Sequence, residues 1–242
     1  MQQHTSFLNK MERKFGKIAI PNLMNIIIFG MAIVFVIDTF TNPDYQYKLS
    51  SILYFDRGLI LQGQVWRLLT FIFIPPNSSI FFIIFALYFY WLIGSSLEAQ
   101  WGSFKFNVFY FTGVLFNIVS GFITGYALND YLNLTLFLAF AMLYPNFQVL
   151  LFFFIPIKIK WLAWLGAALL VYSMIFNTFA GRMAIIISVL NFLLFFWKDI
   201  LYSVKMFWRR HFGAGKRFRQ ENDQNKTWKN HWWNDNDNNP FK

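Results

Sequence analysis

The sequence is dominated by long apolar stretches with few charged residues. An α-helix needs about 20 mostly apolar residues to cross roughly 30 Å of hydrocarbon. Six stretches reach this length: 20–39, 78–97, 104–127, 132–154, 161–180 and 183–202. Only 13% of the residues are charged, whereas soluble domains have about 25% and need them to cover their surface. The sequence therefore predicts an all-α, polytopic membrane protein with six transmembrane helices.

The positive charges of the chain indicate which way these spans face. All but four of the 21 Lys and Arg residues fall on the side of the predicted membrane that holds both termini, and the exceptions are Lys48, Arg57, Arg67 and Arg182. Because Lys and Arg are retained in the cytoplasm, both termini should be cytoplasmic. This topology accounts for the net charge of +10, so we expect no nucleic-acid partner. We expect a bacterial plasma membrane in preference to the endoplasmic reticulum.

The chain divides into three parts. Residues 1–19 form a basic cytoplasmic N-terminus, residues 20–202 the membrane domain, and residues 203–242 a tail that is first basic and then rich in Asn. The basic half of the tail should touch anionic lipid headgroups, and the polar half should be disordered. Between the first two spans, residues 40–77 form a long external loop in which apolar residues recur at helical spacing. This spacing predicts short amphipathic helices at the membrane interface.

Two short motifs lie beside the predicted spans. The external loop carries Trp66-Arg67 near its end, and Gly94, Glu98 and Gly102 are spaced four residues apart where the second span gives way to the third. In their order and in their placement relative to the spans, these motifs resemble those of the rhomboid superfamily, which consists of six-span membrane proteins. The long first loop and the cytoplasmic N-terminus are similar to that family too. The resemblance implies a rhomboid-like bundle of six transmembrane helices.

The motif residues also have interpretations that rest on their chemistry alone. Trp66 suits a membrane–water interface, and Arg67 can reach headgroups or bind carbonyls within the loop. We expect both at the external interface, because an arginine at the bilayer centre costs several kcal/mol. Gly94, Glu98 and Gly102 should form one compact cytoplasmic turn in which the carboxylate caps backbone N–H groups. The alternatives are ordinary interfacial anchoring for the Trp-Arg pair and a solvated loop carboxylate for Glu98.

Two further features concern the third and fourth spans. Gly121 and Gly125 place small residues four apart on the third span, with Ser120 and Thr124 beside them. This pattern predicts helix packing rather than a binding site. Pro145 interrupts the fourth span and predicts a kink, although the backbone carbonyls freed there could also bind a ligand.

The catalytic residues that the rhomboid resemblance implies are missing. Active rhomboids are intramembrane serine proteases, with a serine in a Gly-x-Ser-Gly element on the fourth span and a histidine on the sixth. Residues 126–160 contain neither serine nor glycine, and the only histidines, His4, His211 and His231, fall in the predicted tails. A serine nucleophile needs a base within hydrogen-bond reach, and none is available in the spans. Three dispersed histidines and no cysteine also leave no metal site, and we expect no cofactor.

Bulky apolar residues replace the family's small catalytic segment on the fourth span. They are Leu136, Phe137, Leu138 and Phe140. We expect them to fill the cavity that admits water and substrate in an active rhomboid. The fourth and sixth spans should then meet through apolar side chains, and the protein should have no measurable peptidase activity.

These features favour a catalytically inactive, rhomboid-like pseudoprotease similar to the derlins. Such a protein would bind transmembrane segments of client proteins or perturb the bilayer, in a quality-control or adaptor role. Two alternatives stay open: an active intramembrane protease with unconventional residues, and a small-solute transporter. Specific cleavage of a single-span substrate would identify the first, and uptake into proteoliposomes the second.

Overall fold

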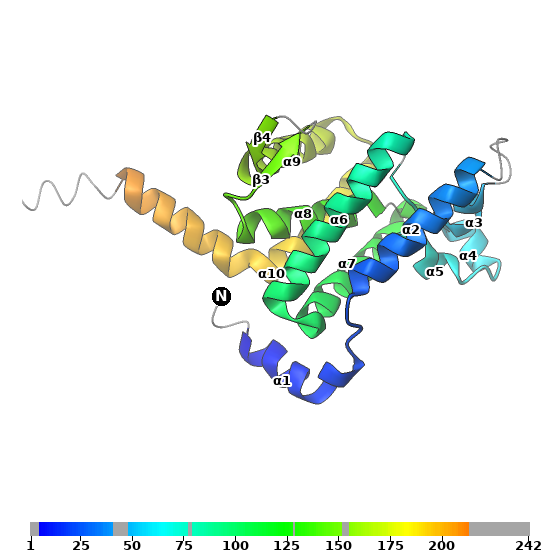
Figure 1. The fold of residues 1–242 in the computed structure, drawn as a ribbon, viewed down its shortest axis with the longest axis horizontal. Coiled ribbons are helices and arrows are strands. Elements are labelled where there is room, and N and C mark those ends of the chain that lie inside the picture. The colour runs from blue at the N-terminus through cyan, green and yellow to red at the C-terminus, as the bar shows by residue number, and fades with distance from the viewer. Residues whose placement is uncertain (1–4, 41–47, 77–78, 128, 152–154, 213–242) are drawn as a thin grey trace, which may run out of the picture. The chain divides into compact units, whose positions relative to one another are not determined.

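Helices make up most of the computed structural model, which describes residues 5–40, 48–76, 79–127, 129–151 and 155–212 (Figure 1). In chain order the elements are α1 (Thr5–Phe15), η1 (Gly16–Ile18), α2 (Leu23–Phe40), α3 (Leu49–Leu53), β1 (Phe55–Asp56), α4 (Arg57–Leu61), α5 (Arg67–Thr70), η3 (Phe71–Phe73), α6 (Ile80–Trp101), α7 (Ser103–Thr124), β2 (Tyr126–Ala127), α8 (Asn129–Leu143), β3 (Gln148–Leu151), β4 (Ile155–Lys158), α9 (Ile159–Phe176) and α10 (Phe179–Phe212). Strands β1 and β2 form one small antiparallel sheet, and β3 and β4 form another. The chain divides into two units, 1–196 and 197–242. The described part of the second unit is the end of α10.

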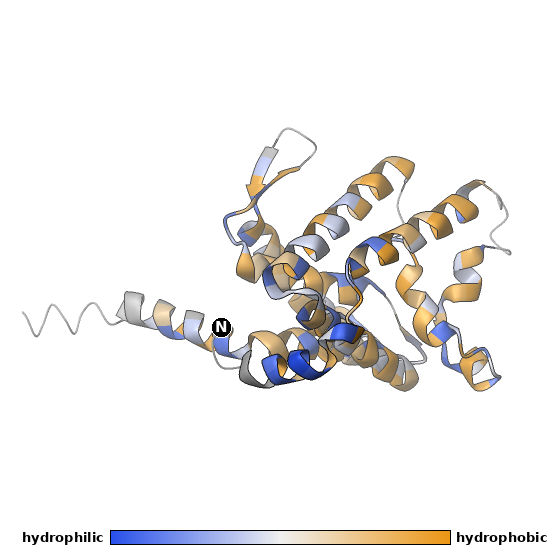
Figure 2. Ribbon diagram, turned by 60° about the horizontal axis from the view of Figure 1, so that its bottom comes forward, coloured by the Kyte–Doolittle hydropathy of each residue, from blue (hydrophilic) through white to orange (hydrophobic). Residues whose placement is uncertain are grey.

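Five helices of the described chain are long and apolar enough to cross a membrane. They are α2, α6, α7, α9 and the Gly181–Lys198 part of α10. Figure 2 shows hydrophobic residues around the long helices rather than along one stripe, which is typical of membrane spans. These helices give the chain the architecture of a multi-pass membrane protein. They correspond to the first, second, third, fifth and sixth predicted spans.

The predicted fourth span, 132–154, is wrong in its extent. Helix α8 has 15 residues, and at a rise of about 1.5 Å per residue it is shorter than the hydrocarbon layer. It ends because Pro145 lacks an N–H group and disfavours helical backbone at the residue before it. The chain turns there instead of kinking, with the backbone N of Phe147 donating to the Tyr144 carbonyl at 3.1 Å. It then continues into the β3–β4 hairpin.

Two other predictions, the short helices of the first loop and the end of the sixth span, have different outcomes. The loop between α2 and α6 contains the short helices α3, α4 and α5, as the apolar spacing predicted, and its external position stays a prediction. Helix α10, in contrast, continues to Phe212, past the predicted end of the sixth span at residue 202. Its Lys and Arg residues are good helix formers, so the basic start of the tail extends the helix. The Asn-rich half of the tail, predicted to be disordered, lies outside the described residues.

Helix α7 lies at the centre of residues 1–196. Half of its most apolar stretch (50%) is buried inside the protein, compared with 6% for α9. Gly113 lets two other helices approach α7 at one level, because a Cβ atom there would lie 2.6 Å from Leu132 Cδ1 and 2.8 Å from Asn191 Nδ2. Leu132 belongs to α8 and Asn191 to α10. The short α8 and the last helix therefore both pack on α7.

Helices α2 and α6 run side by side in Figure 1 and contact each other along their length. Gly94 of α6 permits this close approach, since a Cβ atom there would lie 2.3 Å from Met24 Cγ and 2.7 Å from Met24 Cβ. Met24 itself is buried. The packing of the first two spans thus depends on a missing side chain at Gly94.

Gly94→Ala should destabilise the protein by about 1–3 kcal/mol, because its methyl group would overlap Met24 and force α2 and α6 apart. Gly166→Ala in α9 is a matched control, since a Cβ atom there would lie at an ordinary 3.7 Å from Leu134 Cδ1. Both changes bring the same gain in helix propensity, so their difference isolates the packing. Thermal unfolding in detergent measures the difference. Equal melting temperatures would contradict the close contact.

Candidate functional site

Arg67 organises the loop between α2 and α6. Its side chain is buried, with 4% of the residue exposed. Nη1 donates to the carbonyls of Ser51 (3.1 Å) and Tyr54 (2.9 Å), and Nε donates to Gln64 Oε1 at 2.8 Å. The guanidinium carbon also lies 5.0 Å from the centre of the Tyr54 ring. Of the two roles considered for this arginine, the structure shows the binding of carbonyls within the loop.

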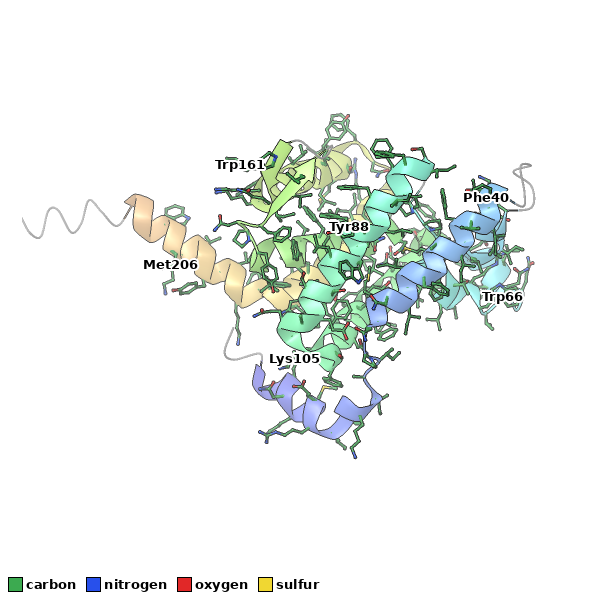
Figure 3. All side chains as sticks on the ribbon, viewed as in Figure 1. Phe40, Trp66, Tyr88, Lys105, Trp161 and Met206 are labelled. Carbon is green, nitrogen blue, oxygen red and sulfur yellow. The ribbon has the colours of Figure 1, made fainter. Side chains whose placement is uncertain are left out.

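Trp66 lies at the surface of the same loop and is 48% exposed (Figure 3). Its Nε1 donates to the Ile52 carbonyl at 3.4 Å, a weak contact compared with those of Arg67. Neither residue belongs to a helix of spanning length. Their position at the external membrane interface stays a prediction.

The loop is also tied to distant parts of the chain. Asn129, at the start of α8, donates from Nδ2 to the Ile72 carbonyl at 2.9 Å. Asp56 caps α4 by accepting from the backbone N of Leu59 at 3.0 Å, and this N–H group lowers the pKa of the carboxyl. The contact between Asn129 and Ile72 could not be predicted from the sequence, because the two residues are far apart along the chain.

Glu98 binds both the segment before α2 and the first residue of α7. Its Oε1 accepts from the backbone N of Asn22 at 2.8 Å and from Ser103 Oγ at 2.6 Å. The N–H groups around Glu98 are already bonded within α6, so the side chain reaches a free N–H group of another segment. Asn22 has a φ of 54°, in the left-handed region that few non-glycine residues adopt. The carboxylate therefore holds this backbone bend.

The compact turn predicted for Gly94, Glu98 and Gly102 is only partly correct. Gly94 lies inside α6 and packs on α2, as described above. The turn into α7 consists of Gly102 alone, which has a φ of 83°. Only glycine adopts such a backbone at little cost, and this explains how two long helices join through a single residue.

Two more contacts hold the N-terminal segment against the start of α7. Lys105 Nζ lies 3.3 Å from Glu12 Oε2, and Asn107 Nδ2 donates to the Ile20 carbonyl at 3.1 Å. Figure 3 shows Lys105 at the end of the bundle that α1 approaches. Together with Glu98, these residues bind the segment before α2 at three points.

The helix–helix packing predicted for Gly121 and Gly125 is not what the structure shows. Gly121 faces the first loop, where a Cβ atom would lie 2.5 Å from Cε1 of Phe55. Gly125 ends α7 with a φ of 97°, and its N donates to the Gly121 carbonyl at 2.8 Å. The pair therefore anchors the loop and terminates the helix, because the tertiary fold brings Phe55 to this face.

The segment between Leu136 and Phe140 of α8 is packed with apolar side chains. Leu136 and Phe140 of α8 are each 1% exposed, and the Phe137 ring lies 5.9 Å from that of Phe89. Helix α10 meets this region at α7, where the buried Asn191 donates from Nδ2 to the Phe109 carbonyl at 3.3 Å. Helices α8 and α10 thus both pack on α7, and a direct apolar contact between the fourth and sixth predicted spans stays a prediction.

The described structure places no histidine beside these helices. His4 and His231 lie outside the described residues, and so does the side chain of His211. In the part of the chain that is described, the buried hydroxyl of Ser120 has no hydrogen-bond partner. The absence of a catalytic pair therefore stays a prediction from the sequence.

An apolar groove of about 580 Å³ lies between α6 and the β3–β4 hairpin. One wall consists of α6 side chains between residues 81 and 92, including Tyr88 (Figure 3), and the other of residues 147–150. We call it the α6–β3 groove. The sequence did not reveal it, because residues 148–151 were assigned to a span.

The hairpin is anchored at its base. The backbone N of Ile159 donates to the Phe147 carbonyl at 2.8 Å, and that of Lys160 donates to the Pro145 carbonyl at 3.2 Å. Tyr144 OH donates to Gln100 Oε1 at 3.3 Å, which links the end of α8 to the last turn of α6. These bonds fix the wall of the groove relative to both neighbouring helices.

No protein-family model matches the chain, and no curated protein matches it either. What the protein does must therefore be inferred from its own residues. Among the features above, the Arg67 and Glu98 contacts are internal to the fold. The α6–β3 groove is the feature that offers space to a ligand.

Arg67→Lys should destabilise the protein by about 2–3 kcal/mol, because an ammonium group cannot reproduce the fixed fork of donors in a buried site. Arg57→Lys is the control. Arg57 is exposed, its Nη1 donates to the Phe122 carbonyl at 3.0 Å, and the change should cost less than about 1 kcal/mol. Thermal unfolding followed by tryptophan fluorescence compares the two. A larger loss for the Arg57 variant would contradict the role given to Arg67.

Glu98→Ala should cost about 1–3 kcal/mol and should speed amide exchange at Asn22, because it removes a charged acceptor from that N–H group. Glu12→Ala is the control for the same segment. Its ion pair with Lys105 is partly exposed, so its loss should cost less than about 1 kcal/mol. Hydrogen exchange read by mass spectrometry checks both variants. An unchanged rate of amide exchange at Asn22 in the Glu98→Ala variant would indicate that Glu98 is a solvated loop carboxylate.

Proposed function

We propose that this protein is a catalytically inactive, rhomboid-like membrane protein that binds transmembrane segments of client proteins or perturbs the bilayer, in a quality-control or adaptor role. The observation that supports this most is the α6–β3 groove, which is lined by apolar and aromatic side chains along a helix of spanning length. Apolar clefts with a few polar groups are where ligands usually bind. Here the polar groups are the Tyr88 hydroxyl and the Gln148 amide.

The surface of α6 supports a membrane-embedded client. Only 22% of the most apolar stretch of α6 is buried inside the protein. Ile84, on the wall of the groove, is 67% exposed. A neighbour in the bilayer therefore meets an apolar helix face with a hollow beside it. A transmembrane segment matches this surface in length and in polarity.

The shortness of α8 supports the second part of the proposal, a local perturbation of the bilayer. With 15 residues α8 is about 22 Å long, whereas hydrocarbon is about 30 Å thick. A bilayer meets such a mismatch by thinning around the protein. Thinner hydrocarbon would ease the entry of a client segment that carries polar residues.

The sequence supports the remaining parts of the proposal. The missing serine and histidine favour binding without cleavage, and the distribution of Lys and Arg favours cytoplasmic termini in a plasma membrane. Anionic headgroups are the proposed partners of the basic tail. An unconventional protease and a small-solute transporter are the competing functions.

Photocrosslinking in proteoliposomes tests the proposal. A photoreactive phenylalanine at Ile84 should capture a labelled single-span peptide more efficiently than the same probe at Trp164 of α9. Both positions are strongly exposed, at 67% and 74%, but only Ile84 lines the groove. The labelled peptide should stay intact. Equal capture at the two positions would contradict a specific site, and a cleaved peptide would indicate the protease instead.

A further inference from the structure

The last helix, α10, carries exposed apolar side chains at a regular spacing. They are Leu190, Leu194, Trp197, Leu201, Val204 and Trp208, each between 44% and 59% exposed. Their separations alternate between four and three residues, which is the spacing of the a and d positions in a coiled coil and places all six on one helix face. We call this face the α10 seam. A helix that only faces lipid needs no such regularity.

Within residues 1–196 the protein packs against a different face of α10. Asn191, Phe192 and Phe196 are buried. The Asn191 amide donates to the Phe109 carbonyl, and the ring of Phe196 lies 6.4 Å from that of Phe109. In the heptad these three α10 residues take positions e, f and c, and none of them is an a or d position. The core of the protein therefore leaves the α10 seam uncovered.

The α10 seam continues beyond the part of the helix that suits a bilayer. The apolar stretch ends at Lys198, whereas the helix continues to Phe212. At a rise of about 1.5 Å per residue, Val204 lies about 9 Å beyond Lys198 along the helix axis. The headgroup layer is only about 5–7 Å thick on each side, so lipid tails do not cover this end of the seam. Contiguous exposed apolar side chains in such a place mark an interaction site.

The residues that flank the seam suit a second copy of the same helix. Lys198 and Lys205 take the e positions, and Leu193 and Ile200 take the g positions. In a parallel coiled coil each e residue faces a g residue of the partner. Each lysine would therefore lie beside Leu193 or Ile200 of the other copy, where its methylene groups cover apolar surface and its charge meets no like charge.

We propose that the α10 seam binds the α10 seam of a second copy of this chain, as a parallel, in-register coiled coil that begins inside the bilayer and continues beyond it. Two copies inserted with the same topology present α10 in the same direction and at the same depth. An unrelated partner would have to match both the spacing and the depth, whereas a second copy matches them without further conditions. This self-association goes beyond the proposed function and does not depend on it.

Disulfide crosslinking tests the seam cleanly, because the chain has no cysteine of its own. Full-length Leu201→Cys and Val204→Cys proteins in proteoliposomes should form disulfide-linked dimers on mild oxidation, since facing a and d positions lie within disulfide reach. Tyr202→Cys is the matched control. Tyr202 is 66% exposed and adjoins Leu201, but it takes an outer b position. Two outer cysteines lie too far apart to be bridged without backbone movement, so this variant should stay monomeric.

Each other result of the crosslinking would overturn the proposal. Equal linkage of the three variants would indicate random collision, and no linkage of any variant would indicate that the seams do not meet. A water-soluble maleimide distinguishes a further case. Protection of the Leu201→Cys and Val204→Cys thiols from maleimide, without disulfide formation, would show that this face lies on the bilayer surface or is covered by lipid instead.

A second pair of variants tests the association without crosslinking. Energy transfer between donor- and acceptor-labelled copies of the full-length protein, at low protein-to-lipid ratio, should be lost in Val204→Glu, because two carboxylates would be buried against each other at a d position. Tyr202→Glu adds the same charge on the outer face and should leave the transfer unchanged. Equal effects of the two variants, whether loss or no change, would overturn the proposal. If Val204→Glu does not fold, the cysteine variants still decide.

Discussion

Backbone N–H and C=O groups need hydrogen-bond partners wherever water is excluded, and in a chain this apolar most of the backbone lies in such surroundings. The long helices meet this need within themselves. The loop between α2 and α6 cannot, and there Arg67 donates to two loop carbonyls while Asn129 donates to a third. Glu98 plays the opposite part, accepting from the free N–H group of Asn22. Charged and amide side chains thus complete the hydrogen bonding of non-helical backbone.

The need for backbone hydrogen-bond partners also applies to the β3–β4 hairpin. Pro145 ends α8 early, and the residues that follow leave helical structure beside α6. Inside the hairpin the ladder pairs its own groups, and Pro156 removes a donor from one edge. The β3 edge, with the outward backbone groups of Gln148 and Leu150, borders the apolar groove. In this protein an incompletely paired strand edge therefore lies beside the groove on which the proposed function rests.

The helices differ in how closely they pack against the rest of the protein. Gly94 lets α2 approach α6 closely, and Gly102 alone joins α6 to α7. Helix α9 has only 6% of its most apolar stretch buried, and it follows the hairpin directly. The walls of the groove are α6 and the hairpin, which is held at its base by the bonds of Ile159 and Lys160.

The sequence by itself determined the membrane character, five of the six predicted spans and the short helices of the loop between the first two, because apolar runs of spanning length and helical spacing are local properties of the chain. It also located Arg67 and Glu98 as residues with a role, since charged groups beside spans need partners. Only the tertiary structure decided what those partners are, because Ser51 and Asn22 lie far from them in sequence. It also determined where α8 ends and where the α6–β3 groove lies. Apolar residues resume after Pro145, and only the contact with α6 and the pairing with β4 show that they form a strand.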